Sequence, residues 1–365
     1  MKYKDYVLKR VLFLFPILLG VSFITWFLID SCGDPLAAYI DERALDEMTL
    51  EEIDELKKEL GMNQPWYIRF TKHIFRIFQG DWGTSGVYFG YRPVFNLVGE
   101  YFPATIELAF ASMILSIVIG VPLGVLSAVK TNQKPDMIIR VSYLTGFSLP
   151  VFYLGMLISF LIFQVTFEIG AGVNDHSLIG AIPYRYRFNS KVFNYPHTIV
   201  FGVLPSTGLL TIDSLLSLNP FLFIDATFRL MLPGIVLAIS QIAIISRMTR
   251  MAMIETMKQD YILLARAKGL PERIIIYKHA LRNAILPTLT IGSLVLATLL
   301  TGTVLVETVF YWPGLGTFVT TAISTLDMPC IQGFVLISTF LYVGINLAVD
   351  LLYGVIDPRI REKMS

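Results

Sequence analysis

The feature that most constrains the fold is a set of six apolar stretches, each long enough to cross a membrane as a helix. They cover residues 11–29, 104–129, 138–165, 230–246, 287–306 and 331–352. A spanning helix needs about 20 mainly apolar residues. Lipid cannot satisfy free backbone groups, so such spans must be helices. Since 55% of all residues are hydrophobic and only 16% are charged, the sequence predicts an all-α integral membrane protein with six transmembrane helices.

The distribution of positive charge predicts the orientation of these spans. Segments 1–10, 129–140, 246–284 and 353–365 hold 18 of the 29 Lys and Arg but only 7 of the 28 acids. Because Lys and Arg accumulate on the cytoplasmic side, we expect a multi-pass cell (plasma) membrane protein with both termini in the cytoplasm. The first apolar run resembles a signal sequence, but it is long and Asp30–Asp34 is a poor cleavage site, so we expect a retained span.

This topology divides the chain into six segments. They are a cytoplasmic N-terminus with the first span (1–29), an extracytoplasmic helical loop (30–102), the second and third spans (103–165), an extracytoplasmic insertion (166–229), the fourth to sixth spans with a hairpin at 253–286 (230–352), and a cytoplasmic tail (353–365). In the first large loop, Thr49 and Glu52 have the spacing of a capping box, and Gly61 lies where the resulting helix is expected to stop.

The longest polar segment of the second half, Asp260–Pro287, makes up most of this hairpin. Its pattern predicts two short helices. One face of the first helix carries Tyr261, Leu264, Ala265 and Lys268. Gly269 can end that helix in the left-handed conformation, and Pro271 fits the first turn of a second helix running to about Arg282. We expect the hairpin to offer an apolar ridge and several cations to a partner; a plain amphipathic linker is the alternative.

Three stretches of this segment carry a resemblance to a known family. They are Ala265-Arg266-Ala267-Lys268-Gly269-Leu270, His279-Ala280-Leu281-Arg282-Asn283-Ala284 and Leu286-Pro287. They resemble the cytoplasmic coupling loop of ABC importer permeases, most closely the dipeptide and oligopeptide permease family. Leu263-Leu264-Ala265 stands where the general importer pattern has Glu-Ala-Ala, which is typical of the peptide subfamily. The resemblance extends over nearly the whole chain except the insertion.

The resemblance implies a permease subunit of an ATP-driven importer that moves di- or oligopeptides by alternating access. Implied partners are a homologous second permease, two cytoplasmic ABC ATPase subunits, an extracytoplasmic substrate-binding protein and membrane lipid, with no nucleic acid. No cofactor is expected on this chain, since ATP and Mg would sit in the ATPase subunits. The implied coupling residues are Tyr261, Ala265, Arg266, Ala267, Lys268, Gly269, Leu270 and Pro271, with His279 orienting the hairpin through a hydrogen bond.

A second group of residues is predicted to border the translocation path or its gate. Glu107 begins an apolar span, where an acid should face protein or water; it either lines the path or pins two helices. Glu307, with Pro313 and Gly314, lies in a loop that resembles the family's loop between the last two spans, and a structural turn is the alternative. Asp350 lies in the similar carboxyl-terminal stretch.

Other parts of the extracytoplasmic segments are less specific. Residues 184–193 (YRYRFNSKVF) could contact a ligand carrier or form an ordinary surface loop, and Leu204–Gly208 resembles a short family signature. Cys32 and Cys330 could form a bridge, but two free thiols are the more common arrangement.

The sequence lacks the motifs of an enzyme. There is no Gly-Lys dipeptide for a phosphate-binding loop, no His-Glu-x-x-His and no Gly-x-Ser-x-Gly. The four histidines are too scattered to suggest a metal site. We therefore expect a pore-forming subunit. The alternatives are the same machinery importing oligosaccharides or a metal chelate, or a secondary transporter driven by an ion gradient, which would normally show repeated halves.

Overall fold

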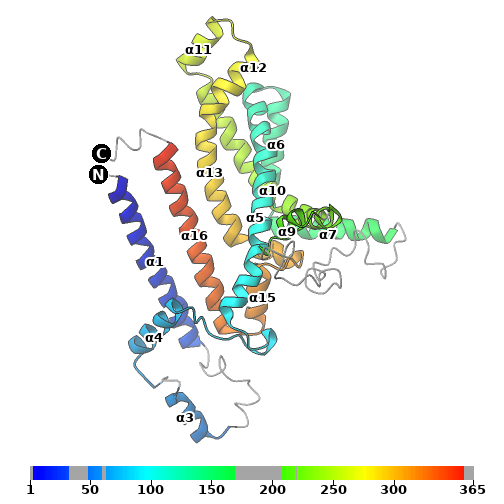
Figure 1. Cartoon of the computed structure of the whole chain (residues 1–365). Helices are drawn as coiled ribbons and strands as arrows, with labels where there is room; N and C mark the ends of the chain where they lie inside the picture. Colours follow the sequence, from blue (N-terminus) through cyan, green and yellow to red (C-terminus); the bar gives the residue numbers. More distant parts are fainter. Residues whose placement is uncertain (1–2, 33–47, 60–62, 169–206, 219, 357–365) are drawn as a thin grey trace. The chain divides into compact units, whose positions relative to one another are not determined.

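A computed structural model of the chain describes residues 3–32, 48–59, 63–168, 207–218 and 220–356. These residues form helices joined by turns, with one isolated bridge between Thr84 and Pro93 and no strand (Figure 1). The predicted all-α fold class is confirmed. The chain divides into two compact units, Met1–Pro103 with Gly314–Ser365 and Ala104–Pro313.

The first unit contains the two ends of the chain. Its helices are α1 (Tyr3–Cys32), α3 (Leu50–Glu59), α4 (Trp66–Phe78), the short turn η2 (Val87–Phe89), the start of α5 (Val94–Val129), α15 (Leu315–Ser324) and α16 (Met328–Ile356). Helices α1 and α16 pack against each other. A buried core joins the start of α5 to α15 and α16, and it consists of Val94, Leu97, Val98, Leu315, Phe318, Ala322 and Cys330.

The second unit is built around one long helix, α10 (Pro220–Thr256). The other helices are the rest of α5, α6 (Lys134–Ser148), α7 (Val151–Glu168), α9 (Leu210–Leu216), α11 (Asp260–Ala267), α12 (Glu272–Ile274), the π-helical turn η3 (Ile275–Ala280), α13 (Leu281–Gly302) and α14 (Val304–Val309). Helix α10 contacts α6, α7, α9, α13 and α14. A Cβ on Gly124 of α5 would lie 2.6 Å from Cβ of Thr249, so a small residue is needed where α5 meets α10.

The predicted third span, residues 138–165, is wrong as a single helix. Helices α6 and α7 meet at a bend of 96°. Leu149, between them, has an extended backbone (φ −94°, ψ 133°). Pro150 follows it, and a proline disfavours the helical conformation in the residue before it. The apolar run therefore continues through the bend although the helix does not.

The other predicted spans coincide with helices, with shifted ends. Among the described residues, four helices are long and apolar enough to cross a membrane, or five if the bent pair forms one span. Helix α10 begins at Pro220, inside the segment predicted to be extracytoplasmic. Helix α1 contributes a shorter apolar segment, Leu12–Leu28. The count of six spans and the placement of the loops stay predictions.

The local predictions for the first large loop are confirmed where the structure describes it. The backbone N–H of Thr49 donates to Glu52 Oε2 at 2.8 Å, and the N–H of Glu52 approaches Thr49 Oγ1 at 3.4 Å. This is the reciprocal capping box at the start of α3, and its hydrogen bonds lower the pKa of Glu52. Gly61 and residues 184–193 lie outside the described residues. Cys330 is a buried free thiol; the side chain of Cys32 is not described.

Candidate coupling site

The segment predicted to couple the chain to a partner lies between α10 and α13 of the second unit. After α10 ends at Thr256, α11 occupies Asp260–Ala267. Gly269 has φ +70°, the left-handed conformation expected after a helix end. The prediction that this glycine separates two helices is thus confirmed. In Figure 1, α11 and α12 lie together at the end of α13.

The second helix of the hairpin differs from the prediction. Pro271 (φ −59°) is the residue before α12 rather than part of its first turn. The helix does not stop near Arg282: α12, η3 and α13 follow one another, and residues Glu272–Leu300 qualify as one candidate span. The turn η3 carries the extra residue of a π-helix, a feature frequent at functional sites. Helix α11 is therefore one short helix that connects α10 to the continuous helix formed by α12, η3 and α13.

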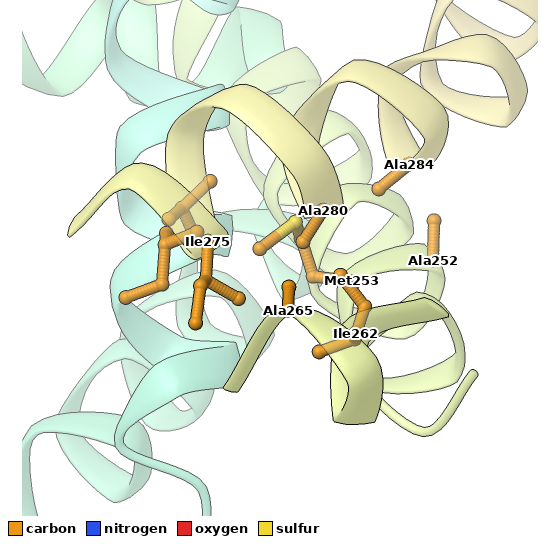
Figure 2. Close-up of a cluster of buried hydrophobic side chains, with 9 residues drawn as sticks. Ala252, Met253, Ile262, Ala265, Ile275, Ala280 and Ala284 are labelled. Atoms are coloured by element: carbon orange, nitrogen blue, oxygen red, sulfur yellow. The ribbon is translucent and has the colours of Figure 1, made fainter. Parts of the chain in front are cut away.

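A buried apolar cluster holds α11 in place. We call it the coupling core; it comprises Val125, Ala252, Met253, Ile262, Ala265, Ile275, Ile276, Ala280 and Ala284. Figure 2 shows Ile262 and Ala265 of α11 gathered with Met253 of α10 and Ala280 of η3. Ile262 and Met253 are fully buried. Since burying an Ile side chain contributes about 1.5–3 kcal/mol, α11 is anchored to the ends of α5, α10 and α13.

The outer surface of the same segment is apolar and exposed. We call it the coupling ridge; its side chains are Tyr261 (40% exposed), Leu263 (55%), Leu264 (57%), Leu270 (36%), Ile274 (41%) and Tyr277 (63%). Two polar contacts fix its shape: Arg266 donates to Glu272 Oε1 at 2.7 Å, and Asn283 Nδ2 donates to the Tyr261 hydroxyl at 2.8 Å. An exposed apolar surface of this kind is typical of a contact with another protein.

The predicted coupling residues divide into one buried residue and seven exposed ones. Ala265 is buried in the coupling core, so it does not share an exposed face with Tyr261, Leu264 and Lys268. The exposed ones are Tyr261, Arg266, Ala267, Lys268, Gly269, Leu270 and Pro271. His279 contributes its backbone oxygen, which accepts a hydrogen bond from Asn283 at 3.2 Å.

The candidate path residue Glu307 is fully buried at the start of α14. Its Oε1 accepts hydrogen bonds from Thr303 Oγ1 at 2.7 Å and from Thr105 Oγ1 of α5 at 2.9 Å. Nearby in sequence, Trp312 Nε1 donates to the backbone oxygen of Ala104 at 2.7 Å. These contacts tie the segment after α13 to α5, as the structural-turn alternative expects.

The other residues predicted to border the path, Glu107, Pro313, Gly314 and Asp350, come from different elements of the fold. Glu107 is buried on α5, and its Oε1 accepts a hydrogen bond from the backbone N–H of Thr211 in α9 at 2.6 Å. This contact joins α5 to α9, as expected if the acid pins two helices. Pro313 ends the second unit, and Gly314 begins the next segment of the first unit, before α15. Asp350 lies in α16, and its side chain is not described.

Sequence reasoning missed a buried ion pair in the second unit. Asp136 of α6 accepts hydrogen bonds from Arg250 Nε at 2.8 Å and Arg250 Nη2 at 3.0 Å, and also from the Asn132 backbone N–H and the Ser127 hydroxyl. Asp136 is fully buried. The sequence does carry a signal for this pair: an acid follows Pro135 directly, at the start of an apolar run. The sequence analysis treated that acid only as one of the charges of a loop.

A cavity of about 320 Å³ was also not predicted. It is lined by side chains of four helices, namely Val151, Phe152, Leu237, Ser240, Gln241, Thr298, Leu299, Leu305 and Val306. Within the described residues, Gln241 Oε1 is buried without a hydrogen-bond partner. A buried unsatisfied carbonyl of this kind carries a desolvation cost of about 1–3 kcal/mol.

Comparison with known proteins identifies the family of the chain. Residues 120–362 match the family described as binding-protein-dependent transport system inner membrane component. The chain is 39% identical over 340 residues to the probable D,D-dipeptide transport system permease protein DdpB of Escherichia coli (strain K12), covering 93% of this chain and 92% of that protein. It is 36% identical over 360 residues to the dipeptide transport system permease protein DppB of the same strain (98% and 99% covered).

A relative from another genus matches over a similar share of its length. The oligopeptide transport system permease protein AppB of Bacillus subtilis (strain 168) is 32% identical over 356 residues, with 97% of this chain and 98% of that protein covered. The aligned range therefore includes residues 30–102 and 166–229, the two segments predicted to be extracytoplasmic. By sequence, and in keeping with its long apolar helices, this chain belongs to the family of binding-protein-dependent transport system inner membrane components, as a multi-pass membrane permease subunit rather than an enzyme.

Proposed function

We propose that this chain is the transmembrane permease subunit of an ATP-driven ABC importer that translocates di- or oligopeptides delivered by an extracytoplasmic binding protein. The observation that carries the proposal is the coupling ridge, an exposed apolar surface held by a buried core at the ends of three long helices. The cargo class is supported by the relatives, which are D,D-dipeptide, dipeptide and oligopeptide permeases.

The proposed assembly contains this chain, a homologous second permease, two cytoplasmic ATPase subunits and the binding protein, all around a path through the lipid bilayer. The ATPase subunits hold ATP and Mg, and this chain holds no cofactor. The coupling ridge and both termini lie in the cytoplasm, as the excess of Lys and Arg in segments 1–10, 129–140, 246–284 and 353–365 predicts.

The proposed mechanism follows from the packing of α11. ATP binding and hydrolysis change the separation of the ATPase subunits, and the docked ridge follows that movement. Ile262 and Ala265 pack against Met253 and Ala280, so α11 cannot shift without the ends of α10 and α13. Such a rigid-body displacement turns a movement at the ridge into a change of helix packing along the path.

The path or gate itself is proposed to be bordered by Glu107, Glu307, Pro313, Gly314 and Asp350. Two of these acids are already engaged in hydrogen bonds, Glu307 with Thr105 and Thr303, and Glu107 with Thr211. A gate at these positions opens by exchanging those contacts for others, without adding a charge to the membrane interior.

The test is reconstitution of the complete importer in proteoliposomes with Leu264→Asp in this chain. A carboxylate in the ridge should remove ATPase subunits from the purified complex and abolish ATP-dependent uptake of labelled alanyl-alanine. Leu215→Asp in α9 is the matched control, because Leu215 is 59% exposed and Leu264 is 57% exposed, and its complex should retain both ATPase chains.

Two results would contradict the proposal. Uptake that continues without ATPase subunits and responds to an ion gradient would indicate a secondary transporter. ATP-dependent activity with no uptake of alanyl-alanine, D-alanyl-D-alanine or longer peptides, but with uptake of an oligosaccharide or a metal chelate, would leave the machinery in place and refute the cargo class.

A further inference from the structure

Helix α4 (Trp66–Phe78) follows the first span and has two sharply different sides. The exposed apolar side carries Tyr67 (55% exposed), Phe75 (64%) and Phe78 (77%), and Trp66 (54%), the first residue of the helix, borders it through a ring contact with Tyr67. The opposite side carries the cations Arg69, Lys72 and Arg76. None of the residues of α4 is fully buried, so this apolar face is not the face of a core helix.

One end of α1 holds α4 by both charge and aromatic packing. Arg69 forms a two-pronged ion pair with Asp30, in which Nη2 lies 2.9 Å from Oδ2. Its guanidinium also lies over the Trp26 ring, 5.6 Å from the centroid. The Phe70 ring packs on Phe23, with 5.2 Å between the ring centroids.

Helix α16 also contacts α4, through a residue near the start of α16. His73 Nε2 lies 2.8 Å from Gln332 Nε2, near the start of α16. Asp30 lies two residues before the end of α1, and Gln332 lies four residues after the start of α16. Helices α1 and α16 pack side by side, so α4 is held where α1 ends and α16 begins. For a pair of membrane-spanning helices, such an end is where the bilayer meets water.

The exposed face of α4 is continuous with the outer surface of α1. Trp66 packs on Phe23 at 5.9 Å between ring centroids, and Phe23 stacks on Phe27, also at 5.9 Å. Phe27 is 49% exposed and Ile24 is 57% exposed. On a spanning helix such side chains meet lipid, so the lipid-facing surface extends from α1 onto α4.

From this geometry we propose that α4 lies in the membrane–water interface, with Tyr67, Phe75 and Phe78 among the phospholipid headgroups and upper acyl chains. Lys72 and Arg76 then lie at the height of the lipid phosphates. Aromatic side chains flanked by cations are the composition of interfacial helices and of the aromatic belts of membrane proteins. The helix acts as an anchor that holds the extracytoplasmic segment, including α3, against the bilayer.

The proposal is tested by depth measurement on the assembled importer in nanodiscs of phosphatidylethanolamine and phosphatidylglycerol. A nitroxide label is placed at Phe78→Cys or Phe75→Cys, with Lys72→Cys on the polar side as the matched control, all in a Cys32→Ser background that leaves buried Cys330 in place. Power-saturation EPR compares collision with oxygen, which concentrates in lipid, and with a water-soluble nickel chelate.

We expect the labels at positions 78 and 75 to collide severalfold more with oxygen than with the nickel chelate, and the label at position 72 to show the reverse. Equal access of the nickel chelate to all three positions would place α4 in water and overturn the proposal. Poor access to both reagents at positions 75 and 78 would show that protein covers the face, which also overturns it. Because the measurement needs no transport, its outcome is independent of the cargo class.

Discussion

The Asp136–Arg250 ion pair gives the sharpest quantitative prediction, because a second arginine beside the same acid serves as its control. The Asp136 side chain is 1% exposed and that of Arg250 is 15% exposed. Arg140 Nη1 lies 4.0 Å from Asp136 Oδ2, but its side chain is 51% exposed. Both pairs join opposite charges, and they differ in burial and in the number of hydrogen bonds.

Burial sets the expected magnitudes. Removing one member of a buried ion pair costs about 3–5 kcal/mol, because it leaves the other charge uncompensated. An exposed pair contributes only about 0.2–1 kcal/mol. Arg250→Gln also removes two of the hydrogen bonds to Asp136, at Nε and Nη2. We therefore expect Arg250→Gln to lower the free energy of unfolding by about 3 kcal/mol and Arg140→Gln by less than about 1 kcal/mol.

The assay is denaturant unfolding of the full-length chain in detergent micelles, followed by tryptophan fluorescence. A double-mutant cycle with Asp136→Asn isolates the pairwise energy, since both single changes act on one contact. Most of the loss caused by Arg250→Gln should disappear in the Asp136→Asn background. An equal loss of unfolding free energy for Arg250→Gln and Arg140→Gln, or no coupling energy in the cycle, would refute the conclusion that a buried ion pair stabilises the packing of α6 on α10.

Four further predictions concern separate parts of the chain. Gly269→Val should leave ATP hydrolysis but reduce uptake, because a β-branched residue at φ +70° is strained by roughly 1–2 kcal/mol; Gly269→Asn should couple normally, and equal uptake in both variants would remove the role of the turn. Gln241→Leu should raise the free energy of unfolding by about 1 kcal/mol by removing a buried unpaired oxygen, and a fall on denaturant titration would show that the oxygen is satisfied in the assembly. Glu307→Gln should lower uptake by the assembled complex if the charge works in a gate, whereas unchanged uptake would leave only the hydrogen-bonding role. Burial lowers the pKa of His73 from 6.5 to about 4, so the unfolded chain binds more protons between these values and stability should fall by up to about 3 kcal/mol as pH drops from 6.5 to 4; the slope should vanish in His73→Gln, and its persistence there would assign it to another group.

The features that the sequence predicted correctly depend on neighbouring residues. The capping box needs only Thr49 and Glu52, three residues apart, and the structure shows both of its hydrogen bonds. Gly269 was recognised because only a few residue types favour φ near +70°. The long apolar helices were found for the same reason, since each depends on the composition of one continuous stretch.

The features that the sequence missed depend on distant contacts or on which side of a helix is covered. Asp136 and Arg250 are 114 residues apart, and Thr105 and Glu307 are 202 residues apart. Periodicity predicted a face with Tyr261, Leu264 and Ala265, but the covered side of α11 carries Ile262 and Ala265. An eight-residue helix that is apolar on several sides leaves that choice to its neighbours. The bend after Leu149 was missed because composition does not change there.

The anchoring of α11 also determines where the spans can flex. The coupling core joins α11 to the ends of α10 and α13, and η3 continues into α13 without a break. We therefore expect a force on the ridge to move these helix ends together with α11, with little deformation of the ridge itself. Pro233 lies inside α10 and Pro287 inside α13. A proline removes one hydrogen bond of the helix and clashes with the preceding turn, which makes it the point of lowest resistance to bending. If the ridge transmits force as proposed, we expect its displacement to appear as bending at these two prolines, while the coupling end of the unit moves as one body.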